Sequence, residues 1–195
     1  MPRTGSDDDE ITRWALAARD GDRAAATAFI RSTQQHVQRF LAHLVDATEA
    51  EDLTQETYLR AMRALPSFAG RSTARTWLLA IARRVAADSI RALMVRPRVA
   101  NLEDWQAVAE TATGGAGSRF DDAVVLRHLL HGLATDRREA FVTTQVLGLS
   151  YAEAAEVCDC PVGTIRSRVA RAREDLIAAM TERDQGPTRR LRAIS

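Results

Sequence analysis

The residues with the clearest chemical signal lie in one short stretch, positions 148–173 of this 195-residue chain. Ser150 and Glu153 have the spacing of a capping box, which predicts the start of a short helix. A turn follows, and Pro161 suits the first position of a second helix. That second helix carries four arginines and meets no acid before Glu174. Two short helices around a turn, the second one basic, are typical of the helix-turn-helix motif that reads duplex DNA.

A projection of the second helix at about 100° per residue separates a core face from a DNA-binding face. The core face is predicted to hold Val162, Ile165, Val169, Ala172 and Leu176. Arginine can bond guanine edges in the major groove, and a small neighbouring residue lets the helix approach. We therefore expect base contacts from Arg166, Ser167, Ala170 and Arg171. We expect phosphate contacts from Thr164, Arg168 and Arg173.

The same four arginines could simply solvate an exposed helix. A solvated face usually alternates in sign, whereas these arginines lie within eight residues and have no acid among them. The pattern therefore favours DNA binding over a solvated surface.

Composition indicates an all-α chain. Only 5% of the residues are aromatic, and alanine, leucine and arginine dominate. No apolar run approaches the roughly 18 residues that would predict a membrane span. The acidic start, residues 7–10, does not resemble a signal peptide, so we expect a cytoplasmic protein without membrane insertion. Every basic residue apart from the histidines is an arginine, which is typical of a GC-rich genome.

Breaks in the helical periodicity predict two small helical domains joined by a flexible linker. Glycine, proline and aspartate interrupt the pattern near residues 20–22, 46–47 and 66–70. The residue before Pro97 is disfavoured in a helix, and residues 97–119 end in a glycine-rich run. The predicted parts are a disordered acidic N-terminus (1–9), a first domain (10–96), a linker (97–119), a second domain with the helix-turn-helix (120–181) and a basic tail (182–195).

Charge is segregated within the first domain, although the net charge of the chain is only +1. Residues 46–59 contain five acids and no base, whereas residues 66–101 contain seven arginines and the single acid Asp88. Adjacent blocks of opposite sign predict two partners, one basic and one polyanionic.

The acidic block is predicted to be a helix with one buried face. Thr48 and Glu51 have capping-box spacing. The buried side is predicted to hold Leu53, Tyr58, Leu59, Met62 and Leu65. The outward side is predicted to hold Asp52, Gln55, Glu56, Arg60 and Arg63. By itself this outward side could also be a solvent face in which Glu56 pairs with Arg60.

The basic block is predicted to be a loop followed by a helix. The loop offers Arg71, Ser72, Thr73 and Arg75, and the polar helix side offers Arg83, Arg84, Asp88 and Arg91. Trp77 lies in register with two further apolar residues one and two turns on, so we expect it in the core and not as a platform for stacking bases. A basic loop before a basic helix face is a plausible track for single-stranded nucleic acid.

Four blocks of this sequence resemble the extracytoplasmic-function (ECF, group 4) sigma factors of the sigma-70 family. They are residues 51–61, 75–83, 148–155 and 161–173, which occur in the family's order and spacing. With the lysine-free composition, the resemblance suggests an actinobacterial member. It implies a non-enzymatic protein that binds core RNA polymerase, recognises the minus-35 and minus-10 promoter elements and promotes DNA opening, with no cofactor.

The resemblance also implies a role for each charged block. The acidic helix would dock on the clamp helices of the polymerase β′ subunit through Asp52, Gln55, Glu56 and Arg60. The basic loop and helix would open the minus-10 element and capture an extruded base through Arg71, Ser72, Thr73, Arg75, Arg84 and Asp88. The second domain would read the minus-35 duplex, and the β subunit and an anti-sigma factor are further candidate partners.

Two positions depart from the family pattern. The chain has the pair Arg83-Arg84 where relatives often carry an asparagine, and it has Ala170 where relatives carry larger residues. The first affects which minus-10 base would be captured, and the second affects the minus-35 preference.

Two other functions are compatible with parts of the sequence. A dimeric helix-turn-helix regulator of duplex operators would use the second domain only. A protein-binding helical adaptor would not need the arginines after Pro161. Cys158 with Cys160, and His128 with His131, are too few to predict a metal site, and no nucleophile motif or phosphate-binding glycine loop is present.

Overall fold

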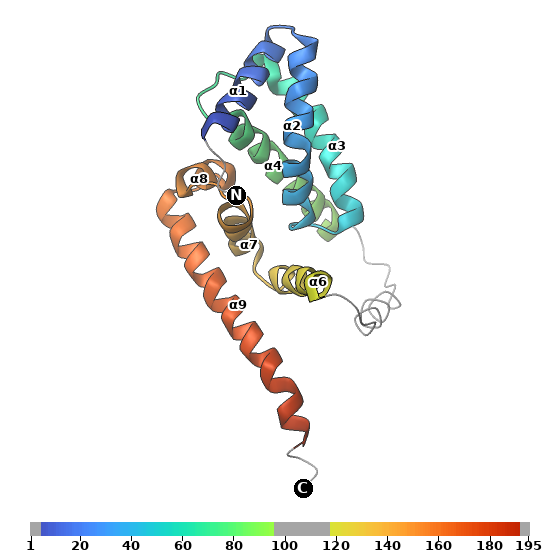
Figure 1. Cartoon of the computed structure of the whole chain (residues 1–195), viewed down its shortest axis with the longest axis vertical. Coiled ribbons are helices and arrows are strands. Elements are labelled where there is room, and N and C mark those ends of the chain that lie inside the picture. The colour runs from blue at the N-terminus through green and yellow to red at the C-terminus, as the bar shows by residue number, and fades with distance from the viewer. Residues whose placement is uncertain (1–4, 96–117, 192–195) are drawn as a thin grey trace.

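The computed structural model describes residues 5–95 and 118–191, and within them every regular element is a helix (Figure 1). The first part of the chain comprises α1, α2, α3, the 3₁₀ turn η1 and α4, which span Gly5–Arg19, Arg23–Ala42, Ala47–Ala64, Leu65–Ser67 and Ala74–Val95. The second part comprises α6, α7, the π-helical segment η3, α8 and α9, which span Ser118–His131, Thr135–Phe141, Val142–Val146, Tyr151–Cys158 and Val162–Leu191. None of these helices is long and apolar enough to cross a membrane.

The helix breaks fall where glycine, proline and aspartate predict them. Asp22 caps α2, because its Oδ1 accepts the backbone N–H groups of Ala24 and Ala25 at 2.8 and 3.0 Å. Gly21 beside it has φ 102°, a conformation that side chains other than glycine rarely adopt. The break at residues 66–70 holds η1 and a loop, and Phe68 in that loop packs on Trp77 with ring centroids 4.9 Å apart. Trp77 is partly buried and packs against the core, which agrees with its predicted inward position.

The helix-turn-helix forms with the predicted capping box at its start, whereas α9 begins at Val162, one residue after the predicted Pro161. Ser150 Oγ accepts the N–H of Glu153 at 3.2 Å, and the Glu153 carboxylate accepts the N–H of Ser150 at 2.8 Å. Asp159 ends α8 in the left-handed conformation, with φ 51°, and turns the chain toward α9. The capping-box prediction for this motif is confirmed.

Other details of the sequence prediction are wrong. The Thr48–Glu51 capping box does not form, because α3 already begins at Ala47, with Asp46 at the cap position and no side-chain cap bond. Leu59 is 55% exposed, and Val162 is 36% exposed at the first turn of α9, where the neighbouring helices do not reach.

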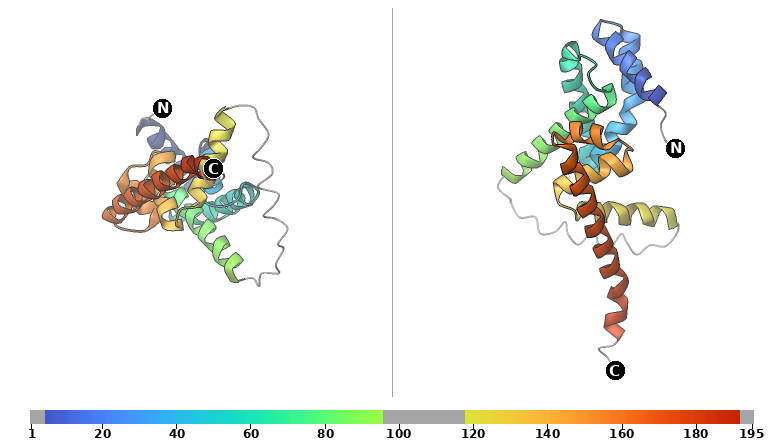
Figure 2. Two further views of the ribbon diagram at one scale, coloured as in Figure 1. Left: turned by 90° about the horizontal axis from the view of Figure 1, so that it is seen from below. Right: turned by 90° about the vertical axis from the view of Figure 1, so that its left-hand side faces the viewer.

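Both ends of the described chain are also more helical than predicted. Helix α1 starts at Gly5, inside the segment expected to be disordered, with two acids in its first turn, where they suit the helix dipole. Helix α9 continues past residue 181 to Leu191 and extends beyond the other helices (Figures 1 and 2). The predicted linker lies outside the described residues, except for positions 118 and 119, which belong to α6.

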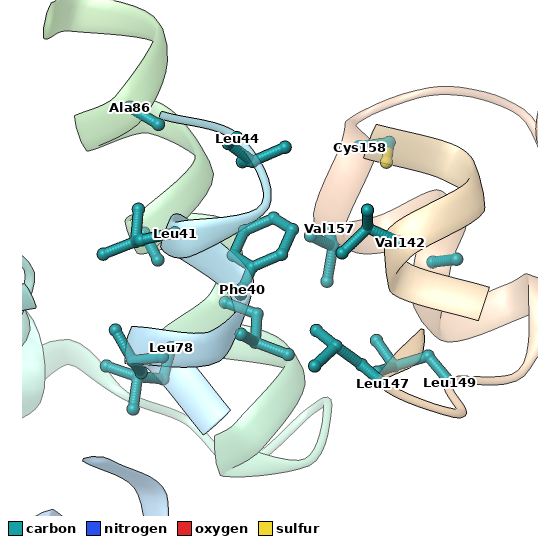
Figure 3. Close-up of a cluster of buried hydrophobic side chains, with 14 of the residues drawn as sticks. Phe40, Leu41, Leu44, Leu78, Ala86, Val142, Leu147, Leu149, Val157 and Cys158 are labelled. Atoms are coloured by element: carbon teal, nitrogen blue, oxygen red, sulfur yellow. The ribbon is translucent and has the colours of Figure 1, made fainter. Parts of the chain in front are cut away.

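The two parts of the chain share one continuous apolar core. Helix α4 of the first part packs against α8 of the second, as well as against α1, α2 and α3. Figure 3 shows Phe40 of α2 and Leu44, two residues after the end of α2, pointing toward Val142 and Val157 of the second part. All four side chains are buried. The periodicity of the sequence predicted each separate core face but not this contact between the parts.

Polar groups close the edge of this junction. Arg138 of α7 donates from Nη1 to the backbone carbonyl of Leu44 at 3.2 Å and from Nη2 to that of His131 at 2.7 Å. The same Nη1 lies 3.5 Å from Nδ1 of His131. Burial lowers the pKa of His43, and Arg39, Arg127 and His131 lower it further.

Histidine 131 shares this basic environment. Burial and the Arg138 guanidinium lower its pKa, with smaller contributions from Arg127 and His128, whereas Asp46 opposes the shift. Protonating either histidine therefore adds positive charge to a junction that already contains arginines from α2, α6 and α7.

Acid should loosen this junction. Because the packed arrangement lowers both pKa values, it is fully favoured only above about pH 6.5, the ordinary histidine pKa, and it weakens as the pH falls below that value. We expect the radius of gyration from small-angle X-ray scattering to increase as the pH is lowered from about 7.5 to 5.5. Each histidine can raise the equilibrium constant for separation of the two parts by up to about tenfold per pH unit. NMR titration of the two imidazoles should give pKa values below the ordinary one.

The double variant His43→Gln/His131→Gln should lose most of this pH dependence. His128→Gln is the control: His128 is an exposed histidine on the same helix and the smallest of the causes that lower the pKa of His131, so this variant should keep most of the pH dependence. A double variant that expands with acid as the wild type does would assign the effect to other groups.

Candidate nucleic-acid and protein interfaces

The first turns of α9 present the predicted DNA-binding face to solvent. Ile165, Val169 and Ala172 are buried, and they fix which side of the helix faces the core. On the opposite side the four residues predicted to contact bases are all exposed: Arg166, Ser167, Ala170 and Arg171. Two arginines that flank small residues can approach a groove without a steric barrier.

The residues predicted to contact phosphates are held differently. Arg168 is only one-quarter exposed; its Nε lies 3.1 Å from Asp136 and its Nη1 donates to Cys160 Sγ at 3.5 Å. Arg173 donates to the Gln145 side chain at 2.9 Å, and Thr164 is half-buried. These arginines fasten α9 to α7 and η3, so a phosphate would have to compete with partners within the protein.

The outer face of α3 combines acidic side chains with an exposed leucine. Asp52 and Gln55 are exposed, and Glu56 is partly exposed and accepts a hydrogen bond from Arg60 Nε at 2.7 Å. Leu59 lies one turn after Gln55 and is more than half exposed. The sequence prediction placed Leu59 in the core because it adjoins the apolar stripe. Its spacing of four residues from both Gln55 and Arg63 was the signal for an outward position.

The predicted minus-10 residues are divided between solvent and the junction. Arg71 lies exposed in the loop, and Arg84 and Asp88 are exposed one turn apart on α4. Thr73 has a structural role, since its Oγ1 accepts the N–H of Thr76 at 3.2 Å, a cap at the start of α4. Ser72 beside it is half-buried.

Arg75 is the exception, because it is buried with 3% exposure. Its Nη2 donates to the carbonyl of Leu147 in the second part at 3.5 Å, and its Nε lies 3.7 Å from Asp8 of α1. In this arrangement the second part covers Arg75, so it cannot reach DNA. The sequence could not show this, because Leu147 is 72 residues away along the chain.

Arg83 likewise serves the junction. Its Nε donates to the Glu139 carboxylate at 2.7 Å, and Glu139 is almost fully buried. Of the unusual pair Arg83-Arg84, the first residue therefore joins α4 to α7 and only the second faces solvent.

An ion-pair network connects α3 to α4. Asp88 accepts from Arg60 Nη1 and from Arg91 Nη2, both at 2.7 Å. The Arg60 bond is the largest cause of the lowered pKa of Asp88. A residue predicted to bind polymerase, Arg60, is thus paired with a residue predicted to bind the minus-10 element.

The cysteines and histidines do not form a metal centre within the described ranges, where no group of three or more potential metal-binding side chains occurs. Burial raises the pKa of the Cys158 thiol to about 12, so this thiol is protonated at neutral pH. Cys160 is partly buried and accepts the contact from Arg168.

Comparison with protein-family models matches both parts of the chain. Residues 29–94 match sigma-70 region 2, and residues 123–176 match sigma-70 region 4. The chain is 53% identical over 178 residues to the ECF RNA polymerase sigma factor SigC of Mycobacterium tuberculosis, an alignment that covers 91% of this chain and 95% of SigC. It is 32% identical to the ECF RNA polymerase sigma-E factor of Haemophilus influenzae, over 85% of this chain and 94% of that protein.

Solved structures agree with these matches. CnrH, in complex with the cytosolic domain of CnrY, superposes with a TM-score of 0.68 at 24% identity, which covers 89% of this chain and 98% of CnrH and shows a common fold. The sigma factor RpoE from Bartonella quintana, in complex with the anti-sigma factor NepR, superposes with a TM-score of 0.62 at 26% identity, which covers 80% of this chain and 96% of RpoE.

Removing the charge of Glu139 should weaken the junction between the two parts. Arg83 is three-quarters buried, and Glu139→Gln removes its counter-charge. We expect this to reduce the free energy that holds the two parts together by about 2 kcal/mol. We expect faster hydrogen–deuterium exchange around residues 147–149 and along α4. Glu174→Gln, an exposed change on α9, is the control. Equal exchange in the two variants would mean that the apolar contacts alone hold the junction.

Proposed function

Because this chain belongs to the extracytoplasmic-function group of the sigma-70 family, we propose that it docks on core RNA polymerase through the outer face of α3 and contacts promoter DNA through α4 and α9. Residues 10–96 would engage polymerase and the minus-10 element, and residues 120–181 the minus-35 element. Residues 97–119 would connect the two sites. The observation that carries the minus-35 assignment is the exposed face of Arg166, Ser167, Ala170 and Arg171 opposite a buried stripe.

Polymerase docking would centre on Leu59. An exposed apolar side chain surrounded by polar residues is the arrangement of an interface anchor, which is desolvated by the partner while its neighbours exclude water. Asp52, Gln55 and Glu56 surround it with acidic and amide groups that complement a basic helical surface such as the β′ clamp helices. The β subunit would be a second contact.

Promoter binding would require the two parts to separate. Arg75 is covered by the second part, and Arg83 is paired with Glu139 across the junction. Both arginines would become available to the minus-10 strand once α8 leaves α4. Binding of α3 and the second part to separate sites on polymerase would supply the free energy for that separation.

An anti-sigma factor is a candidate third partner. The structural relative RpoE was solved in complex with the anti-sigma factor NepR. We propose that a protein of that kind holds this chain in its packed arrangement.

The proposal is tested by in vitro transcription with purified core polymerase on a pooled promoter library. If the chain is a sigma factor, core polymerase supplied with it will produce specific transcripts, and the templates of these transcripts will share two spaced motifs. Retained binding to duplex DNA without binding to core polymerase would instead indicate the dimeric helix-turn-helix regulator.

Arg171→Ala should impair minus-35 recognition specifically. Loss of one arginine contact to a base edge costs about 1–3 kcal/mol, so transcription from a minus-35-dependent promoter should fall roughly tenfold or more. The dissociation constant for core polymerase should stay within about twofold. Arg31→Ala, an exposed arginine on α2, is the control. An equal loss of polymerase binding would contradict the proposal that α9 recognises the minus-35 element while α3 docks on polymerase.

Leu59→Ala should impair polymerase binding instead. Truncating a central anchor typically costs more than about 1 kcal/mol, so we expect at least fivefold weaker binding to core polymerase in a fluorescence competition assay. The melting temperature should hardly change, because the side chain is more than half exposed. Gln34→Ala, an exposed change on α2, should have no effect. Unchanged polymerase binding in Leu59→Ala would move the docking surface away from α3.

A further inference from the structure

Four charged side chains on α3 and α4 form a continuous chain of hydrogen bonds. Glu56 accepts from Arg60 Nε, Arg60 Nη1 donates to Asp88 Oδ2, and Asp88 Oδ1 accepts from Arg91 Nη2, each at 2.7 Å. Arg60 thus spans from its own helix to α4, 28 residues further along the chain.

Both oxygens of Asp88 are therefore occupied by arginines. A carboxylate that reads a base must accept from a base amino group, and here a base would have to share each oxygen with a guanidinium that already donates a charge-assisted bond to it. The phosphate backbone would repel an unpaired carboxylate, whereas the negative charge of a carboxylate between two guanidinium groups is neutralised by them.

Arg91 is the residue that Asp88 orients. Its Nη2 is bonded to Asp88 and its Nε donates to the backbone carbonyl of Ala87 at 3.2 Å, yet its side chain is 73% exposed. These two bonds use two of its five N–H groups, so the remaining donors can bind an anion. Arg91 also follows Arg84 by two turns of α4, so the two guanidinium groups extend from a similar side of that helix.

We propose that Arg60 and Asp88 are positioning residues: Arg60 holds Asp88 from α3, and Asp88 holds Arg91 in place to bind a phosphate of the minus-10 strand. On this assignment Arg60 does not contact polymerase, Asp88 does not read a base, and Arg91 becomes an additional DNA contact. The inference rests on the proposed function, since it needs α4 to face promoter DNA.

The restrained position of the Arg91 guanidinium should favour phosphate binding. A free arginine loses side-chain entropy when it engages a phosphate, and part of that loss has already occurred where the guanidinium is bonded on one side. Since Arg60 also bonds Glu56 on the proposed docking helix, the positions of the two faces are linked through one side chain.

A double-mutant cycle tests the assignment. Arg60→Gln, Asp88→Asn and the double variant are assembled with core polymerase at saturating concentration, and promoter affinity is measured as a function of salt. We expect each single variant to weaken promoter binding about two- to fivefold and the double variant to be no weaker than the single ones, because the same bond is lost. Arg60→Lys should recover part of the affinity, because it restores the charge without the two-sided guanidinium.

Three further measurements separate positioning from direct contact. The dissociation constant of Arg60→Gln for core polymerase should stay within about twofold of wild type. Arg91→Gln should weaken binding equally across promoters with altered minus-10 bases and reduce the salt slope of log affinity by about one. Asp88→Asn should leave the order of preference among those bases unchanged. Arg31→Gln, an exposed arginine on α2 outside both proposed binding faces, is the control.

The opposite results would overturn the proposal. Weaker core binding in Arg60→Gln would make Arg60 a polymerase contact, and an altered preference at one minus-10 position in Asp88→Asn would make Asp88 a base reader. Effects that multiply in the double variant would show that the bond does not couple the two residues. Failure of the proposed function is distinguishable, because the wild type would then not direct initiation with core polymerase at all.

Discussion

The packing of α4 against helices from both parts of the chain is the constraint on which the rest of the structure depends. Its apolar face completes the core of the first part, where Leu78, Leu79 and Ala82 are buried. Next to it, α8 covers another side of the same helix. A single helix thus supplies a core face, a junction face and a solvent face. The face on which an arginine of α4 lies determines whether it bonds within the protein or is free to bind DNA.

The arginines clustered in this sequence therefore fall into two groups, those that face solvent and those that bond within the protein. Arg84 and Arg171 present their charges to solvent, whereas Arg75, Arg83 and Arg168 are held by partners within the protein. A buried arginine without its counter-charge costs more than the pair contributes, so each of these pairs restrains the arrangement in which it forms. Counting basic residues overestimates the positive surface offered to DNA while the two parts are packed together.

Local signals in the sequence predicted the local structure well. Ser150 with Glu153, and glycine at position 21, specify caps and turns through bonds between residues close in the chain, and the structure contains them. The positions of Leu59 and the burial of Arg75 were not predictable in the same way. Whether a residue at the edge of an apolar stripe is buried depends on which helix arrives beside it, and the junction joins residues more than 50 positions apart, such as Arg83 and Glu139.

The arrangement of charge on the first part links its two proposed binding faces through one residue. If Arg60 were an independent polymerase contact, its guanidinium would be expected to point outward from α3 beside Asp52 and Gln55. Instead it is bonded on one side to Glu56 and on the other to Asp88 of α4. Exposed ion pairs of this kind contribute little to folding stability. Their effect lies in geometry: they restrict where Arg60 and Arg91 can be, and a restricted cation loses less entropy when an anion binds. The charge pattern of α3 and α4 is thus better understood as preparation for binding than as stabilisation of the fold.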